Sequence, residues 1–187
     1  MQPRMSAKEL DLFLAFVRNS QIYVEFGTGG STFVASRYVK QSIISVDSST
    51  QWIDKVQSAC ADGIVRPKLV FVDIGPTGDW GYPVDQGTRS RWPRYHETVW
   101  DFPESAEADL YILDGRFRVA CFAQTVIHGN PQALIGVHDF ASRKNYHCIY
   151  EIGREIATAE DMSFFQPLAR EQDKAARILE MYKFNPA

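Results

Sequence analysis

Short runs of consecutive apolar residues alternate along the chain with segments whose apolar residues recur every three or four positions. A run that is apolar throughout is typical of a strand buried on both faces, and the three-to-four spacing is typical of an amphipathic helix. The predicted strands are residues 21–26, 42–47, 68–73, 108–114 and 132–139. Helices are predicted at 6–18 after a capping box at Ser6, at 31–40, after Ser48 or Ser49 as far as Gly63, and around 119–126. The alternation predicts an α/β domain with a mostly parallel sheet and helices on both faces.

The pattern changes toward the C-terminus. Ile149, Ile152 and Ile156 are spaced as in one more helix, while the segments 163–168 and 176–184 are predicted to be strands. The polar stretch between these two segments is too short for a helical crossover, so an antiparallel hairpin is expected there.

One segment interrupts the alternation. Residues 75–107, called here the aromatic segment, are much longer than an ordinary loop. Their aromatic residues are Trp80, Tyr82, Trp92, Tyr95, Trp100 and Phe102. Two interpretations stay open: a binding loop that sets substrate specificity, or an excursion packed onto the domain or against another subunit.

Each predicted strand ends in or near an acidic residue. The acids are Glu25, Asp47, Asp73, Asp114 and Asp139. In an open parallel sheet these carboxyl ends lie along one edge, where ligands bind. Asp47 follows Glu25 by 22 positions (47 minus 25), close to the spacing at which a nucleotide-binding unit presents an acid to ribose hydroxyls.

The stretch VEFGTGGSTF, residues 24–33, places a glycine turn between the first strand and a helix. It departs from the dinucleotide pattern because Thr32 stands where glycine or alanine is expected, and because Glu25 would repel a pyrophosphate. Glu25-Phe-Gly27-Thr-Gly29 resembles the first motif of the class I S-adenosylmethionine-dependent methyltransferases. The resemblance implies a Rossmann-like fold over residues 1–187, with a seven-stranded, mostly parallel sheet whose last strand is antiparallel.

Carried over motif by motif, the resemblance implies a cofactor site for S-adenosylmethionine. The glycine turn would face the methionine part, Asp47 would hold the ribose, and Asp73 with Ile74 would meet the adenine. The expected cofactor-binding residues are Glu25, Gly27, Thr28, Gly29, Ser31, Thr32, Asp47, Ser48, Asp73 and Ile74.

The expected catalytic residues are Asp114, Arg116, His138 and Asp139. Either aspartate can act as a general base, and Arg116 or Arg118 can clamp an acidic substrate. Plainer interpretations compete: Asp114-Gly115 is also a turn signal, His138 can be a core histidine, and Arg118 can simply begin a helix.

A divalent metal is left open. Some members of the resembled class hold one between an acid after the fourth strand and an Asp-Asn pair after the fifth. Asp114 and Asp139 match two of these positions, but Phe140 stands in place of the asparagine.

The composition of the chain indicates which classes of binding partner to expect. The chain has 187 residues, 45% of them hydrophobic, and a net charge of -3, which indicates one globular domain without the basic surface that nucleic acid requires. The N-terminus has neither a signal peptide's apolar stretch nor a membrane span, so a cytoplasmic protein is expected.

The predicted function is methyl transfer to a small molecule, with O-methylation favoured. An inactive binding module and an NAD-dependent oxidoreductase are the alternatives, and a homo-oligomer stays open.

Overall fold

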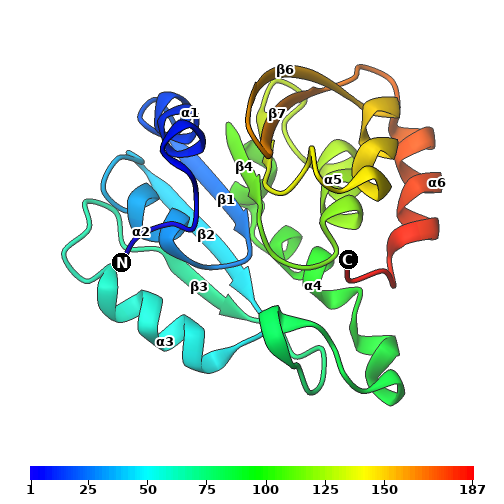
Figure 1. The fold of residues 1–187 in the computed structure, drawn as a ribbon, viewed down its shortest axis with the longest axis horizontal. Helices are drawn as coiled ribbons and strands as arrows, with labels where there is room; N and C mark the ends of the chain where they lie inside the picture. Colours follow the sequence, from blue (N-terminus) through cyan, green and yellow to red (C-terminus); the bar gives the residue numbers. More distant parts are fainter.

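Seven strands form one sheet in the order β3-β2-β1-β4-β5-β7-β6 (Figure 1). The computed structural model describes residues 1–187. The strands are β1 (Ile22–Phe26), β2 (Ser42–Asp47), β3 (Lys68–Phe71), β4 (Leu110–Leu113), β5 (Leu134–Val137), β6 (Gly153–Ala159) and β7 (Met162–Pro167). β7 is antiparallel to β5 and β6, while β1 to β5 pair in parallel. The expected seven-stranded sheet with its last strand antiparallel is therefore confirmed.

Helices cover both faces of the sheet (Figure 1). One face carries α1 (Ala7–Val17), α2 (Gly30–Ala35) and α3 (Thr50–Ala59), and the other carries α4 (Arg94–Glu97), α5 (Arg118–His128) and α6 (Gln172–Tyr182). α6 packs along α5, and α1 lies near β6. None of these helices combines the length and the apolar character that crossing a bilayer requires.

Alternating side chains of the central strands fill two cores. Leu110 and Ile112 of β4 join the core under α1 and α2, whereas Tyr111 and Leu113 join the larger core under α5 and α6. Both sets are buried. Because successive residues of a strand point to opposite faces, an all-apolar strand is what a sheet covered on both sides requires.

Most predicted elements are confirmed, some with shorter bounds. The Ser6 capping box is present: the Ser6 N–H donates to Glu9 Oε2 at 2.8 Å, and the Glu9 N–H donates to Ser6 Oγ at 3.3 Å. Ser49 caps α3. The predicted helix 31–40 ends at Ala35 and continues only as a turn.

Two predictions for the C-terminal part are wrong. The predicted helix through Ile156 is a 3-10 helix over Lys144–Glu151 followed by strand β6. Ile156 is exposed on this edge strand, so its spacing from Ile149 reflected no shared face.

The second predicted strand, residues 176–184, belongs to α6. Ala175 and Ile178 pack in the core beside Leu179 and Tyr182, a spacing of three and four that covers α5. The hairpin is therefore formed by β6 and β7, because α6 has its apolar face satisfied by another helix rather than by a sheet edge.

The aromatic segment is a chain of short helices rather than an open loop. Trp92, Tyr95 and Val99 lie in the larger core, with Trp92 only 3% exposed. Trp80 is 69% exposed, and the guanidinium carbon of Arg4 lies 4.4 Å from its ring centroid. The second half of the segment thus forms part of the domain's core, while the first half lies on the surface.

Replacing Trp92 by alanine is expected to lower the free energy of unfolding by about 3–5 kcal/mol, because it empties a buried aromatic site. Trp80→Ala, which removes only an exposed cation–π contact, should cost about 1 kcal/mol or less. Urea denaturation of both variants measures the difference. Equal losses would mean that the two halves of the segment do not differ in this way.

Candidate functional site

A buried carboxylate lies beneath the glycine turn. Glu25, near the end of β1, has no exposed surface. It accepts hydrogen bonds from the hydroxyls of Ser31 and Thr32 at the start of α2, and from Ser45 Oγ of β2 at 3.1 Å. Burial raises the pKa of Glu25 to about 7, although these hydrogen bonds act to lower it. Glu25 therefore connects the glycine turn, α2 and β2 through hydrogen bonds. The hydroxyls of Ser31 and Thr32 point toward its carboxylate.

The glycine turn lies against the turn between β4 and α5. A Cβ on Gly27 would lie 2.4 Å from the backbone nitrogen of Gly115, and Gly27 has a φ of +104°. No other residue fits there without moving the backbone. A Cβ on Gly29, by contrast, would meet nothing nearer than Trp52 Nε1 at 3.9 Å. Space beside the turn therefore exists at Gly29.

Asp47, at the end of β2, is hydrogen-bonded to the same turn. Its Oδ2 accepts from the Thr28 N–H at 3.1 Å, and its Oδ1 accepts from the Ser49 N–H at 2.9 Å. Burial raises the pKa of Asp47 to about 6 against the lowering effect of these bonds. Ser48 follows Asp47, and its Oγ lies 3.5 Å from the position that a Cβ on Gly81 would take. Asp47 and the glycine turn thus form one unit.

The acid after the third strand lies apart from this unit. Asp73 is exposed, pairs with Arg91 at 2.9 Å and accepts from the Gly75 N–H at 2.9 Å. Ile74 is fully buried. The residues expected to bind adenine therefore follow β3, an edge strand of the sheet. The Asp73 carboxylate is paired with Arg91.

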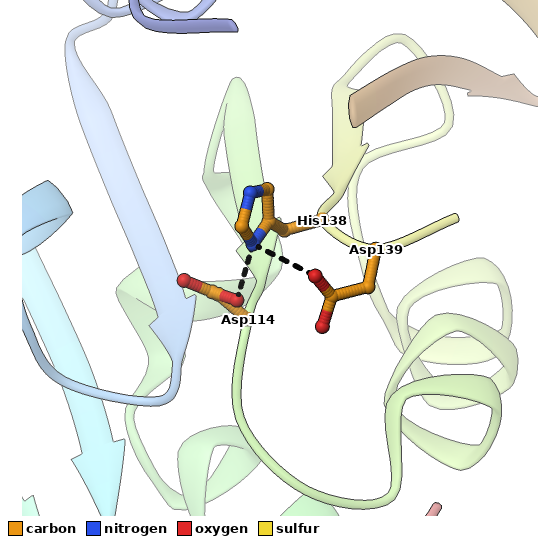
Figure 2. Close-up of side chains that lie close together, drawn as sticks. All are labelled: Asp114, His138 and Asp139. Atoms are coloured by element: carbon orange, nitrogen blue, oxygen red, sulfur yellow. Dashed lines mark hydrogen bonds and ion pairs between the residues drawn. The ribbon is translucent and has the colours of Figure 1, made fainter. Parts of the chain in front are cut away.

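Asp114, His138 and Asp139 form a second cluster at the ends of β4 and β5, where their side chains point toward one another (Figure 2). His138 Nδ1 is 2.9 Å from Asp114 Oδ1 and 3.6 Å from Asp139 Oδ1. Asp139 has a left-handed backbone, with a φ of 55°, at which aspartate is several-fold enriched among non-glycine residues.

Arg118, the first residue of α5, joins the two aspartates. Its guanidinium is 3% exposed and lies 2.9 Å from Asp139 Oδ2 and 3.3 Å from Asp114 Oδ1. It also donates to three backbone carbonyls, those of Asp114, Gly115 and His138. Every polar group of Arg118 has a partner, so its role is to hold these strand ends in place.

The second ring nitrogen of His138 points toward α1. Nε2 lies 3.7 Å from Glu9 Oε2, away from the aspartates. Burial acts to lower the pKa of His138, but the Asp114 hydrogen bond and the two aspartate charges outweigh it, so the pKa is raised. Both ring nitrogens thus face carboxylates of the protein. Asp114 Oδ2 has no hydrogen-bond partner in the chain, which leaves it as the free oxygen of the cluster.

These residues do not fit a divalent metal. A cation between Asp114 and Asp139 would compete with Arg118 for Asp114 Oδ1, and with Arg118 and Arg143 for Asp139 Oδ2, which leaves one oxygen of each aspartate outside these ion pairs. Phe140 is buried and supplies no ligand. The positive charges of Arg118 and Arg143 beside these carboxylates also oppose a dication.

Arg116 lies in the turn between β4 and α5, after Asp114 and next to Gly115, which contacts the glycine turn. It is 6% exposed, and its guanidinium carbon is 4.2 Å from the centroid of the Tyr82 ring. Tyr82 was predicted only as one residue of the aromatic segment, and Arg143 was not predicted for the site. Glu9 as a neighbour of His138 and Trp52 as a donor to the Thr28 carbonyl were not predicted from the sequence either. Only the spacing of Arg143, four residues after Asp139, offered a signal.

The Glu25 carboxyl should make stability depend on pH. Because its pKa is raised in the folded state, its contribution is full below about pH 4.5 and is lost as the pH rises through about 7. Relative to Glu25→Gln, the wild type should lose roughly 3 kcal/mol of unfolding free energy between these limits. Urea titrations from pH 4.5 to pH 8 measure this, with the exposed Glu107→Gln as control. Parallel curves for wild type and Glu25→Gln would contradict the assignment.

Magnesium or manganese should not bind the Asp114–Asp139 cluster, because Arg118 and Arg143 hold one oxygen of each aspartate and their charges oppose a dication. Calorimetric titration with either chloride salt is expected to give no heat of binding beyond that of an Asp114→Asn variant. A saturable site that disappears in Asp114→Asn would show that the arginines give way to a metal.

The comparisons with known proteins concern the fold. No protein-family model and no curated protein sequence matches the chain. The structure resembles that of a methyltransferase-like protein from Silicibacter pomeroyi DSS-3, with 26% identity, 99% of this chain and 98% of that chain covered, and a TM-score of 0.86.

Two more distant structures share the fold. An S-adenosylmethionine-dependent O-methyltransferase from Thermotoga maritima is 11% identical over 91% of this chain and 68% of its own, with a TM-score of 0.58. An RNA methyltransferase from Salinibacter ruber, solved with S-adenosyl-L-homocysteine, is 12% identical over 90% and 95%, with a TM-score of 0.55. The chain therefore has the class I, Rossmann-like fold of the S-adenosylmethionine-dependent methyltransferases.

Proposed function

We propose that the chain is an S-adenosylmethionine-dependent methyltransferase acting on a small molecule, with residues 1–187 as one catalytic domain. The observation that carries the proposal is the unit formed by the glycine turn and Asp47, tied by the Thr28 N–H bond to Asp47 Oδ2. Similarity to structures of methyltransferases supports it.

The residues of this unit fit the cofactor. Gly29 has room beside it, and each Asp47 oxygen accepts one backbone hydrogen bond, which leaves further acceptor capacity for ribose hydroxyls. The desolvated carboxyls of Glu25 and Asp47 favour a ligand that carries positive charge. When bound, S-adenosylmethionine supplies a methyl group on a sulfonium sulfur, and its leaving group is a neutral thioether.

The chain's own residues have to align the acceptor and remove its proton. Asp114 is the base that we propose, because its Oδ2 is free while His138 and Arg118 fix its other oxygen. Burial acts to raise the pKa of Asp139, but Arg118, His138 and Arg143 together hold it below its usual value. Asp139 is accordingly a weaker base, and His138 is a positioning residue.

We propose an oxygen acceptor on a small molecule, because a carboxylate next to the reacting centre suits the proton of a hydroxyl. The surface half of the aromatic segment, with Trp80 and Tyr82, lies beside this edge and would cover such a ligand. The net charge of -3 favours no nucleic-acid acceptor.

A binding module without turnover is the second candidate. It stays the alternative because a fold and an intact cofactor site do not by themselves establish turnover. An NAD-dependent oxidoreductase finds less support, because the Thr32 hydroxyl is committed to Glu25 beneath the turn.

S-adenosylhomocysteine should bind the wild type in calorimetric titrations, and NAD should not. Asp47→Asn is expected to weaken the affinity about 10–100-fold, since a hydrogen bond to a charged group contributes about 1.5–3 kcal/mol. The exposed Asp62→Asn is the matched control and should bind like the wild type. Absence of binding in the wild type would overturn the proposed function, and NAD binding alone would favour the oxidoreductase.

A further inference from the structure

Arg116 is a buried guanidinium without a carboxylate partner. Only 6% of the residue is exposed, and its Nε has no hydrogen-bond partner. A terminal nitrogen donates a long hydrogen bond of 3.5 Å to the carbonyl of Pro186, and the guanidinium also interacts with the side chain of Tyr82. Burying a charge in this state is costly, because the protein replaces little of the hydration that the guanidinium loses.

The neighbouring acids do not neutralise Arg116. Asp114 and Asp139 are paired with Arg118, and Asp139 also pairs with Arg143. Asp47 senses the charge of Arg116, but its oxygens bond to the backbone of Thr28 and Ser49, and its pKa is still raised by burial. A carboxylate in a close pair with a guanidinium would have its pKa lowered instead.

A second arginine interacts with the same tyrosine. The guanidinium carbon of Arg116 is 4.2 Å from the Tyr82 centroid, and Arg143 interacts with the Tyr82 hydroxyl. Burial acts to raise the pKa of Tyr82, yet these two guanidinia bring it below its usual value. Arg118 pairs with Asp114 and Asp139, and Arg143 pairs with Asp139, so neither aspartate is left to pair with Arg116.

Arg116 and Arg143 belong to the same part of the sheet edge as the proposed base. Arg116 follows Asp114 by two residues in the turn after β4, and Arg143 is paired with Asp139, which shares the His138 ring with Asp114. We propose that Arg116 and Arg143 bind an anionic group, a carboxylate or a phosphate, on the acceptor molecule. This rests on the proposed function for the identity of the ligand as acceptor, whereas the anion site itself does not.

The chemistry of the two residues suits this role. A guanidinium presents its N–H donors in a planar fork that matches two oxygens of a carboxylate or phosphate. A bound anion would give Arg116 Nε the acceptor that the chain withholds. Anchoring the acceptor by a group remote from the reacting oxygen would also orient that oxygen toward Asp114.

Anion binding to the full-length protein can be measured by thermal denaturation. Sodium phosphate or sodium succinate is added at constant ionic strength against sodium chloride, with and without saturating S-adenosylhomocysteine. At about ten times its Kd, either probe should raise the Tm of the wild type by about 2–4 °C. Comparison of the two probes distinguishes a phosphate site from a carboxylate site.

The rise in Tm should disappear in Arg116→Gln and in Arg143→Gln and remain in Arg177→Gln, an exposed arginine of α6. If Arg116→Gln does not fold, the partly exposed Arg143→Gln carries the test alone. No rise in the wild type, or an equal rise in all four proteins, would overturn the inference. A rise that saturating S-adenosylhomocysteine abolishes would also overturn the inference. The added anion would then occupy the site of the cofactor's own carboxylate.

These outcomes separate the two proposals. Binding of S-adenosylhomocysteine without an effect of the anions leaves the proposed function standing and removes the acidic acceptor. If the anions act through the arginines but S-adenosylhomocysteine does not bind, the anion site is supported and the proposed methyltransferase function is rejected.

Discussion

The guanidinium of Arg118 connects the carboxyl ends of β4 and β5. It begins α5, reaches the carboxylates that follow the two strands, and bonds carbonyls of the turn between β4 and α5. Burying a charge is costly unless hydrogen bonds satisfy its donors, and here the strand ends supply the acceptors. Arg118 thereby links Asp114 and Asp139, the two aspartates that contact His138. Its presence also explains why a cluster with the composition of a metal site does not fit a metal.

Two electrostatic environments meet at this edge. On one side, Glu25 and Asp47 are carboxyls whose pKa burial raises, which favours a positively charged ligand. On the other side, Arg143 is paired with Asp139, whereas Arg116 has no carboxylate partner and its Nε has no hydrogen-bond partner. A cationic methyl donor and an anionic acceptor would each complete one side. The proposed reaction and the proposed acceptor class are therefore consistent with a single charge distribution.

The aromatic segment shows how one stretch can serve two purposes. Trp92, Tyr95 and Val99 close the core beneath α5, while Trp80 and Tyr82 lie on the surface with Arg4 and Arg116 over their rings. The buried half, built from short helices, anchors the exposed half to the domain. Composition alone could not divide the segment, because the same residue types occur in both halves.

The sequence by itself determined the elements whose physics is local. Apolar runs such as 42–47 became strands with the predicted bounds, and Ser6 with Glu9 formed the predicted cap, because burial pattern and capping depend on near neighbours. The C-terminal part was decided by the tertiary structure. Residues 176–184 carry strand-forming side chains, but the face of α5 was available to cover a helix, and Ile156 lay on an edge strand that exposes it. The candidate site divides in the same way. The glycine turn and its acids were readable as a motif, whereas the pairing of Arg118, the isolation of Arg116 and the arrival of Arg143 depend on which side chains distant segments bring together, since charges in a fold interact through space rather than along the chain.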